Sequence, residues 1–324
     1  MEILWGAEAR PAEPAPTVVT VGMFDGVHRG HAMLFAKVLD DASALSARSA
    51  VVTFDPHPLE VLAPDKAPCV LTTLDQRLRL FEEAGFDIAL VLRFDRELAA
   101  LDPEAFTRAA LVEDLHVRKV IVGEDFRFGH RRAGDVNTLR ELGDRFGFEA
   151  EAIGLLGVQD APRGARSDGP EKISSTEIRR LIGEGKVEDA AELLGHTHRL
   201  AGTVVPGQGI GREMHGLPTA NLEPHPRACL PGLGVYAGWW IWSDERRPGV
   251  INVGRERGPQ LEPSSRAVVE IHVFDYDGDL IGESGEIEFT AFLRPEMRFS
   301  GTAELAAQIR QDAERARGVL ETTT

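Results

Sequence analysis

Cysteine is nearly absent from this chain of 324 residues, which contains only Cys69 and Cys229. The two lie far apart in the sequence, so we expect neither a disulfide framework nor the closely spaced thiolates of a zinc cluster. Sparse cysteine without such spacing is typical of proteins in a reducing compartment. We therefore expect a cytoplasmic protein.

Basic residues are also scarce, because 36 lysines and arginines stand against 52 aspartates and glutamates and leave a net charge of −16. Without a basic excess the chain has no general attraction to nucleic acid or to an anionic membrane, so we expect neither as a partner. No apolar run approaches the roughly 18 residues of a membrane span, and the N-terminal segment lacks the pattern of an export signal. Any site for phosphate groups must therefore be local.

The first half of the chain alternates two kinds of apolar pattern. Short β-rich runs lie at 18–24, 49–54, 88–94, 119–123 and 149–156. Apolar residues at helical spacing lie between them, as over 34–45 and 74–81. This alternation is typical of βαβ units, so we predict a Rossmann-like domain in which helices pack on a parallel sheet.

The second half has a different pattern. After residue 198, β-rich runs are separated by glycine and proline clusters, which predicts a compact antiparallel barrel. We expect two short helices before it, from Ser174 and over 187–195, and an amphipathic C-terminal helix over 305–320 that covers one side of the barrel. These patterns predict domains at 1–186 and 187–324. The segment 158–170, which lacks apolar periodicity, is expected to be a surface loop.

Two histidines, His28 and His31, lie where the first β-rich run gives way to a helical pattern, in GMFDGVHRGHAML (22–34). Ligands of open parallel sheets bind beyond the carboxyl ends of the strands, and a helix start favours anions. Imidazoles there suit a nucleotide phosphate, and Gly26 and Gly30 let the backbone approach it closely. The alternatives are solvated or helix-capping histidines. Zinc is disfavoured, because the spacing is not i, i+4 and no thiolate is near.

The segment ISSTEIR (173–179) is a second candidate for phosphate binding. Its hydroxyl groups belong to Ser174, Ser175 and Thr176, and its guanidinium to Arg179, at a predicted helix start. Hydroxyl residues before a helix usually serve as caps, so this segment by itself is a weak signal.

The barrel half contains one candidate metal site and one candidate base. Thr219 and Asn221 in the segment PTAN offer the hard oxygen ligands that Mg²⁺ prefers. Glu270 lies on a predicted strand, and it could take the proton of a substrate hydroxyl if it faces inward. The alternatives are that PTAN forms a simple turn and that Glu270 faces solvent, as we expect of Glu286 and Glu288.

Four segments of the first half, GMFDGVHRGH, TFDPHP (53–58), VGEDFRFG (122–129) and ISSTEIR, resemble the adenylyltransferase half of the bacterial bifunctional riboflavin kinase/FAD synthetases. The resemblance implies a nucleotidyltransferase-like fold and the transfer of AMP from ATP to FMN, which gives FAD and pyrophosphate. It implies that His28 and His31 bind the triphosphate and stabilise developing charge, while the hydroxyls and Arg179 hold the outgoing phosphates. The implied nucleotide-binding residues are Gly22, Phe24, Asp25, Gly26, Gly30, Ser174, Ser175, Thr176 and Arg179. Asp125 is equally a candidate for flavin contacts and for a turn residue.

The segments GTVVPGQGIGR, PTANL, GVYAG, VEIHVFDYDGDL and FLRPEMRF are similar to the riboflavin kinase half of the same family, so the resemblance covers almost the whole chain. It implies that Thr219 and Asn221 organise Mg²⁺ and ATP, and that Glu270 activates the ribityl 5′-hydroxyl. It also implies that Arg294 belongs to the flavin-side segment. Riboflavin, FMN and FAD are the implied flavins.

Departures from the family pattern are confined to the kinase half. GREMHGLPTAN (211–221) is one residue longer than usual and has Leu217 where an aromatic residue is typical, and NVGRERGPQ (252–260) and DLIG (279–282) also differ. Our leading hypothesis is a bifunctional enzyme that uses Mg²⁺ and ATP at two sites. The alternatives are an FMN adenylyltransferase whose kinase-like half is inactive or acts on a modified flavin, and a non-catalytic flavin- or nucleotide-binding regulator. The sequence leaves homo-oligomer formation open.

Overall fold

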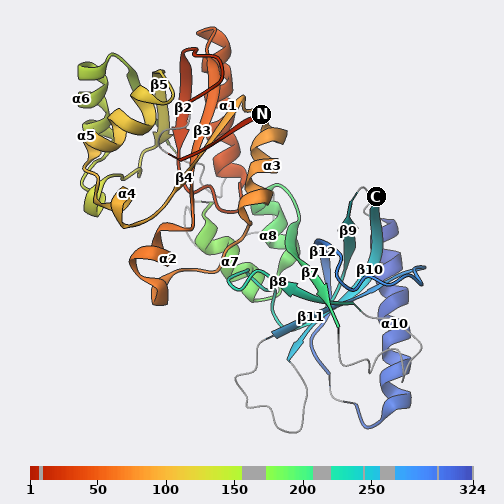
Figure 1. Cartoon of the computed structure of the whole chain (residues 1–324). Coiled ribbons are helices and arrows are strands. Elements are labelled where there is room, and N and C mark those ends of the chain that lie inside the picture. The colour runs from red at the N-terminus through yellow and green to blue at the C-terminus, as the bar shows by residue number, and fades with distance from the viewer. Residues whose placement is uncertain are drawn as a thin grey trace. The chain divides into compact units, whose positions relative to one another are not determined.

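The computed structural model describes residues 1–6, 10–154, 173–206, 220–243, 245–255, 267–297 and 299–322. These residues form two compact units (Figure 1). The first contains residues 1–68, 74–154 and 173–174, and the second contains 69–73 and the described residues from Ser175 onward. The expected surface loop at 158–170 and Thr219 lie outside the described residues.

A six-stranded parallel sheet in the order β1-β4-β3-β2-β5-β6 forms the centre of the first unit. Its strands are β1 Glu2–Trp5, β2 Thr17–Val21, β3 Arg48–Asp55, β4 Ile88–Arg93, β5 Val117–Gly123 and β6 Glu149–Ile153. The last five confirm the predicted runs. Sequence patterns missed β1 because this edge strand has four residues, of which only Leu4 is buried.

Helices cover both faces of this sheet (Figure 1). They are α1 Arg29–Ala44, α2 Pro58–Leu62, α3 Leu74–Ala84, α4 Arg96–Ala100, α5 Pro103–Phe106 and α6 Val136–Phe146, with the short segments η1 Pro64–Lys66, η2 Thr107–Glu113 and η3 His130–Arg132. One face packs on α1 and α3, through residues such as Phe35 and Phe81. The other packs on α5, η2 and α6, through Leu111 and Leu139. The predicted Rossmann-like α/β architecture is confirmed.

The strand order marks the place where this sheet can bind a ligand. Strand β2 lies between β3 and β5, so the chain continues to one side of β2 first and reaches its other side only later. In open parallel sheets the connections diverge at such a position and leave a crevice beyond the carboxyl end of the strand. The segment after β2 is the one that contains His28 and His31.

The second unit contains a closed six-stranded antiparallel barrel in the order β10-β11-β8-β7-β12-β9, as predicted (Figure 1). Its strands are β7 His198–Val205, β8 Ala220–Pro224, β9 Gly234–Trp242, β10 Glu245–Arg255, β11 Ala267–Val273 and β12 Ser284–Arg294, and its helices are α7 Ser175–Gly183, α8 Val187–Leu194 and α10 Thr302–Glu321. The C-terminal helix α10 lies along β9, β10 and β12, where Ala316 and Leu320 pack against Val235 and Ala237.

Glu286 and Glu288 are buried, so the expectation that they face solvent is wrong. Glu288 accepts hydrogen bonds from Arg199 at 2.9 Å and from Arg246 at 2.8 Å. The Arg246 guanidinium lies 3.8 Å from the centre of the Trp239 ring. Strand alternation puts these carboxylates outside the barrel core, but the long arginine side chains cover them there.

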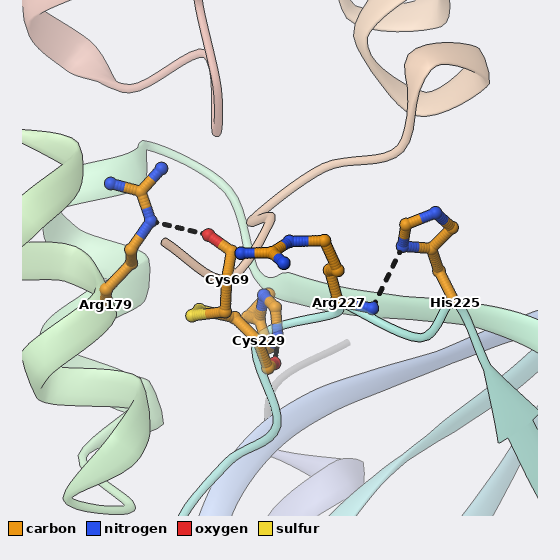
Figure 2. Close-up of a disulfide and its surroundings, with 6 residues drawn as sticks. Cys69, Arg179, His225, Arg227 and Cys229 are labelled. Atoms are coloured by element: carbon orange, nitrogen blue, oxygen red, sulfur yellow. Dashed lines mark hydrogen bonds between the residues drawn. A yellow bond between two sulfur atoms is a disulfide. The ribbon is translucent and has the colours of Figure 1, made fainter. Parts of the chain in front are cut away.

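Cys69 and Cys229 form a disulfide across 160 positions of sequence, which contradicts the expectation of unpaired cysteines (Figure 2). The segment 69–73 packs with the second unit. Its Val70 N–H donates to the Arg227 carbonyl at 2.7 Å, and the Cys229 N–H donates to the Val70 carbonyl at 2.9 Å. The prediction failed because separation along the chain does not limit proximity in the fold.

Candidate active sites

The turn between β2 and α1 has an unusual backbone. Phe24, Gly26 and Val27 all adopt positive φ angles, of 51°, 85° and 39°. A positive φ is costly for a β-branched residue such as Val27, so the surrounding structure must fix this turn firmly. Phe24 and Val27 are both buried, which anchors the turn in the apolar core.

His28 and His31 are brought together at the start of α1. His28 is the N-cap residue of the helix, and its Nδ1 accepts a hydrogen bond from the His31 backbone N–H at 3.3 Å. The two imidazole rings stack with their centres 3.6 Å apart and an angle of 15° between their planes. The edge contact of Phe24 with His31, at 5.1 Å between ring centres, supports the stack from the core side. Both rings therefore lie at the positive end of a helix, where they suit a polyphosphate.

Two glycines keep this turn narrow. A side chain at Gly22 would meet the Phe24 ring at 2.8 Å, and one at Gly30 would meet the His28 ring at 3.2 Å. The carbonyl oxygen of Ile173 would lie 3.8 Å from that same position at Gly30. Ile173, which begins the ISSTEIR segment, is therefore next to the histidine turn, and Ser174 follows it in the same unit.

The rest of ISSTEIR forms the first turns of α7, which packs with the second unit. Thr176 is exposed, and Ser175 and Arg179 are half-buried. The Arg179 Nε donates to the Cys69 carbonyl at 2.7 Å, so this guanidinium lies beside the disulfide (Figure 2). A role of these three residues in nucleotide binding stays a prediction.

Arg77 is a residue that the sequence analysis missed. It is only 2% exposed, although it carries a charge, and it lies on α3 close to Asp25, which is 3% exposed. Burial lowers the pKa of the Arg77 guanidinium, and the attraction of nearby carboxylates opposes this effect. The signal in the sequence was its position, because Arg77 falls within the helical apolar spacing of Leu74, Leu78 and Phe81.

Asp125 lies just beyond the carboxyl end of β5, the strand next to β2. It is exposed and belongs to a turn in which the Phe126 N–H donates to the Gly123 carbonyl at 3.0 Å. The turn that the sequence indicated is therefore present. A contact of Asp125 with flavin stays a prediction, favoured by its place at the same edge of the sheet as the histidine turn.

In the barrel, three polar residues lie directly opposite one another on adjacent strands. Asn221 of β8 pairs with Glu270 of β11, and Glu270 pairs with Asn252 of β10. The Asn252 Nδ2 donates to the Glu270 Oε2 at 3.4 Å. Val269 and Ile271, the neighbours of Glu270, are in the barrel core, so this polar row faces outward. Glu270 is half-buried there, and Asn252 was not among the candidates from sequence.

The same row continues towards Arg294. Asn252 pairs with Val235, and Val235 pairs with Arg294 of β12. Arg294 forms a bidentate ion pair with Asp312 of α10, in which Nη2 donates to Oδ2 at 2.7 Å and Nε donates to Oδ1 at 3.0 Å. This pair links the helix to the barrel. A contact of Arg294 with flavin stays a prediction.

Both halves of the chain match known protein families. Residues 10–163 match the family model described as FAD synthetase, and residues 194–320 match the model described as riboflavin kinase.

Whole proteins match over nearly the full length. A bifunctional riboflavin kinase/FMN adenylyltransferase of Escherichia coli (strain K12) is 38% identical over 301 residues, which is 93% of this chain and 91% of that protein. The protein of the same name from Listeria monocytogenes is 35% identical over 302 residues, with the same coverage of both chains. A crystal structure titled as a macrolide-efflux protein from Streptococcus pneumoniae superposes with a TM-score of 0.82 at 26% identity, covering 98% of this chain and 99% of that one.

Proposed function

Because the chain belongs to the family of bifunctional riboflavin kinases/FMN adenylyltransferases, we propose that it phosphorylates riboflavin to FMN and adenylylates FMN to FAD. We assign adenylyl transfer to residues 1–186 and phosphorylation to residues 187–324. The observation that carries the proposal is that each half matches a different family model and holds its own cluster of suitable residues.

Adenylyl transfer needs no covalent enzyme intermediate. The FMN phosphate oxygen attacks the α-phosphorus of ATP in line, the bond to the bridging oxygen breaks, and pyrophosphate leaves. Positioning and charge stabilisation supply most of the rate in such a reaction. We assign both to His28 and His31, because their stacked rings lie at the N-terminus of α1.

Phosphorylation of riboflavin requires a base. In our proposal the Glu270 carboxylate takes the proton of the ribityl 5′-hydroxyl, whose oxygen attacks the γ-phosphorus of ATP, and ADP leaves. The Asn252 amide holds the carboxylate from the neighbouring strand, so Glu270 has a defined orientation. Its outward position on the barrel leaves it reachable for a substrate.

Magnesium fits the polar row of the barrel. The Asn221 amide oxygen is a hard oxygen ligand, and it lies opposite the proposed base Glu270 on a paired strand. Thr219 precedes Asn221 by two residues and is proposed as the second protein ligand. When bound, Mg²⁺ would neutralise charge on the ATP phosphates.

We also propose that the enzyme works in the cytoplasm, where ATP and flavins are available to it. No helix within the described ranges is long and apolar enough to cross a membrane. The net charge of −16 supports small-molecule substrates rather than nucleic acid as partners.

Two variants of the full chain test the assignment of separate sites. His28→Ala should abolish the formation of FAD from FMN and leave the formation of FMN from riboflavin intact. Glu270→Gln should do the reverse, because it removes the base without changing the shape of the side chain. Chromatography of the flavins with each starting substrate measures both rates. Each variant is the folding control for the other, and equal loss of both activities in either variant would contradict the proposal.

A further inference from the structure

Arg77 contacts the chain at the carboxyl ends of two neighbouring strands. Its Nη1 donates to the Met23 carbonyl at 3.0 Å, just beyond β2, and to the Phe54 carbonyl at 3.2 Å, at the end of β3. The same nitrogen lies 2.9 Å from Thr53 Oγ1, and Thr53 in turn donates to the Met23 carbonyl at 3.2 Å. One guanidinium therefore holds the ends of both strands together.

Its charge also faces the histidine turn. Three carboxylates, those of Asp25, Asp55 and Glu60, attract the buried guanidinium. The Asp55 Oδ1 is 3.6 Å from Nη2 of Arg77, and Asp25 belongs to the turn itself. Burying a guanidinium is unfavourable unless such partners compensate, so an apolar residue would serve the core of α3 better. The buried charge instead contacts the end of β3 and the start of the histidine turn.

The turn needs such support. Phe24, Gly26 and Val27 all have positive φ angles, and this strained backbone leads directly to the N-cap residue His28. Met23, whose carbonyl accepts from Arg77, is the residue immediately before the strained stretch. A donor at that carbonyl fixes the start of the turn, and the stacked histidines fix its end.

We propose that Arg77 is a positioning residue for the adenylyl transfer reaction, which acts by holding the turn that presents His28 and His31. The expected effect on adenylyl transfer rests on the proposed function. The expected effect on the positions of His28 and His31 does not. Lysine is a poor replacement for arginine here, because its side chain ends one atom short of the Nη1 position and lacks a second terminal nitrogen such as Nη2, which lies 3.6 Å from Asp55 Oδ1.

The test compares Arg77→Lys with Leu142→Ala in the full chain. Leu142 is 4% exposed on α6, on the other face of the sheet, so its truncation destabilises the same unit without contacting the turn. At a temperature where both variants are folded, Arg77→Lys should lower kcat for FAD formation by about 10- to 100-fold. The kcat for FAD formation in Leu142→Ala should stay within about twofold of the value for the original chain. The kcat for riboflavin phosphorylation should also stay within about twofold in both variants. An unchanged kcat in Arg77→Lys, or equal losses in the two variants, would overturn the proposal.

A second readout does not depend on activity. Proton–carbon NMR spectra of chains with labelled histidine rings, assigned with His28→Ala and His31→Ala, report the surroundings of the stacked pair. Arg77→Lys should shift both ring signals, and Leu142→Ala should leave them in place. Unshifted signals in Arg77→Lys would overturn the positioning role even if the original chain formed no FAD. If Arg77→Lys shifts the ring signals but the original chain makes no FAD, Arg77 still positions the histidine pair, and the proposed function is rejected instead.

Discussion

Lys119 shows how single charged residues hold the first unit together. Its side chain is 10% exposed and lies 2.8 Å from Asp41, 2.6 Å from Glu151 and 3.0 Å from Glu149. These partners belong to α1 and β6, and Lys119 itself belongs to β5. The lysine therefore ties the helix that begins with the histidine pair to the edge of the sheet.

This cluster predicts a pH-dependent contribution of Asp41 to stability. Burial raises the pKa of Asp41, but hydrogen bonds from Lys119 and Lys37 outweigh it and hold the pKa below its ordinary value of 3.8. The folded chain therefore binds this proton less readily than the unfolded chain. The stabilisation is complete above the unfolded pKa and is lost as the pH falls through the folded one.

We expect Asp41→Asn to lower the free energy of unfolding by roughly 1 to 2 kcal/mol at pH 7. The difference from the original chain should shrink as the pH falls below about 4. Denaturation in urea at several pH values measures this difference in the free energy of unfolding. Asp40→Asn changes the exposed neighbour and is the matched control. If Asp41→Asn lowers the free energy of unfolding equally at pH 3 and pH 7, the charge of Asp41 is not the cause of the stabilisation.

At this scale the sequence predicted the residues with a recognisable motif. His28 and His31 were singled out because their spacing at a strand-to-helix junction has a chemical meaning, and the structure stacks their rings, while their role in catalysis stays a prediction. Arg77 was missed, since an arginine in a helical window is ordinarily a solvated residue. The burial of Glu288 was missed for a related reason, because the arginines that cover it come from strands far away in the sequence.

Among the elements, those with strong periodicity were predicted and those fixed by tertiary contacts were not. Helices α1, α3, α8 and α10 and most of the predicted strands bury apolar residues at regular spacing, which the sequence displays. The edge strand β1 is too short for such a pattern. The segment 69–73 has no such pattern, and long-range contacts such as its bridge to residues 227–229, the disulfide and the hydrogen bond from Arg179 hold it in place.

The disulfide gives a prediction at the scale of elements. It closes a loop of 160 positions. Because this cross-link lowers the conformational entropy of the unfolded chain, it stabilises the fold by up to about 5 kcal/mol. Cys69→Ser should therefore lower the melting temperature under non-reducing conditions. Adding a dithiol reductant, which converts the disulfide to two thiols, should bring the original chain down to the level of the variant. Equal melting temperatures without reductant would show that the bond does not form in solution.

For the whole molecule, the account assigns one reaction to each half of the chain. Both halves have the architecture that the sequence predicted, a parallel sheet flanked by helices and a closed barrel with a C-terminal helix. The departures in the kinase half leave Asn221, Asn252 and Glu270 in one row across three strands. Those departures do not remove the polar groups on which phosphorylation depends in our proposal.

The most direct test is a chromatographic time course of the purified protein with ATP and Mg²⁺, started from riboflavin in one reaction and from FMN in another. The account predicts that riboflavin is converted first to FMN and then to FAD, and that FMN is converted to FAD without a lag. FAD from FMN alone would contradict the assignment of riboflavin phosphorylation to the barrel. The absence of both products would contradict the account as a whole.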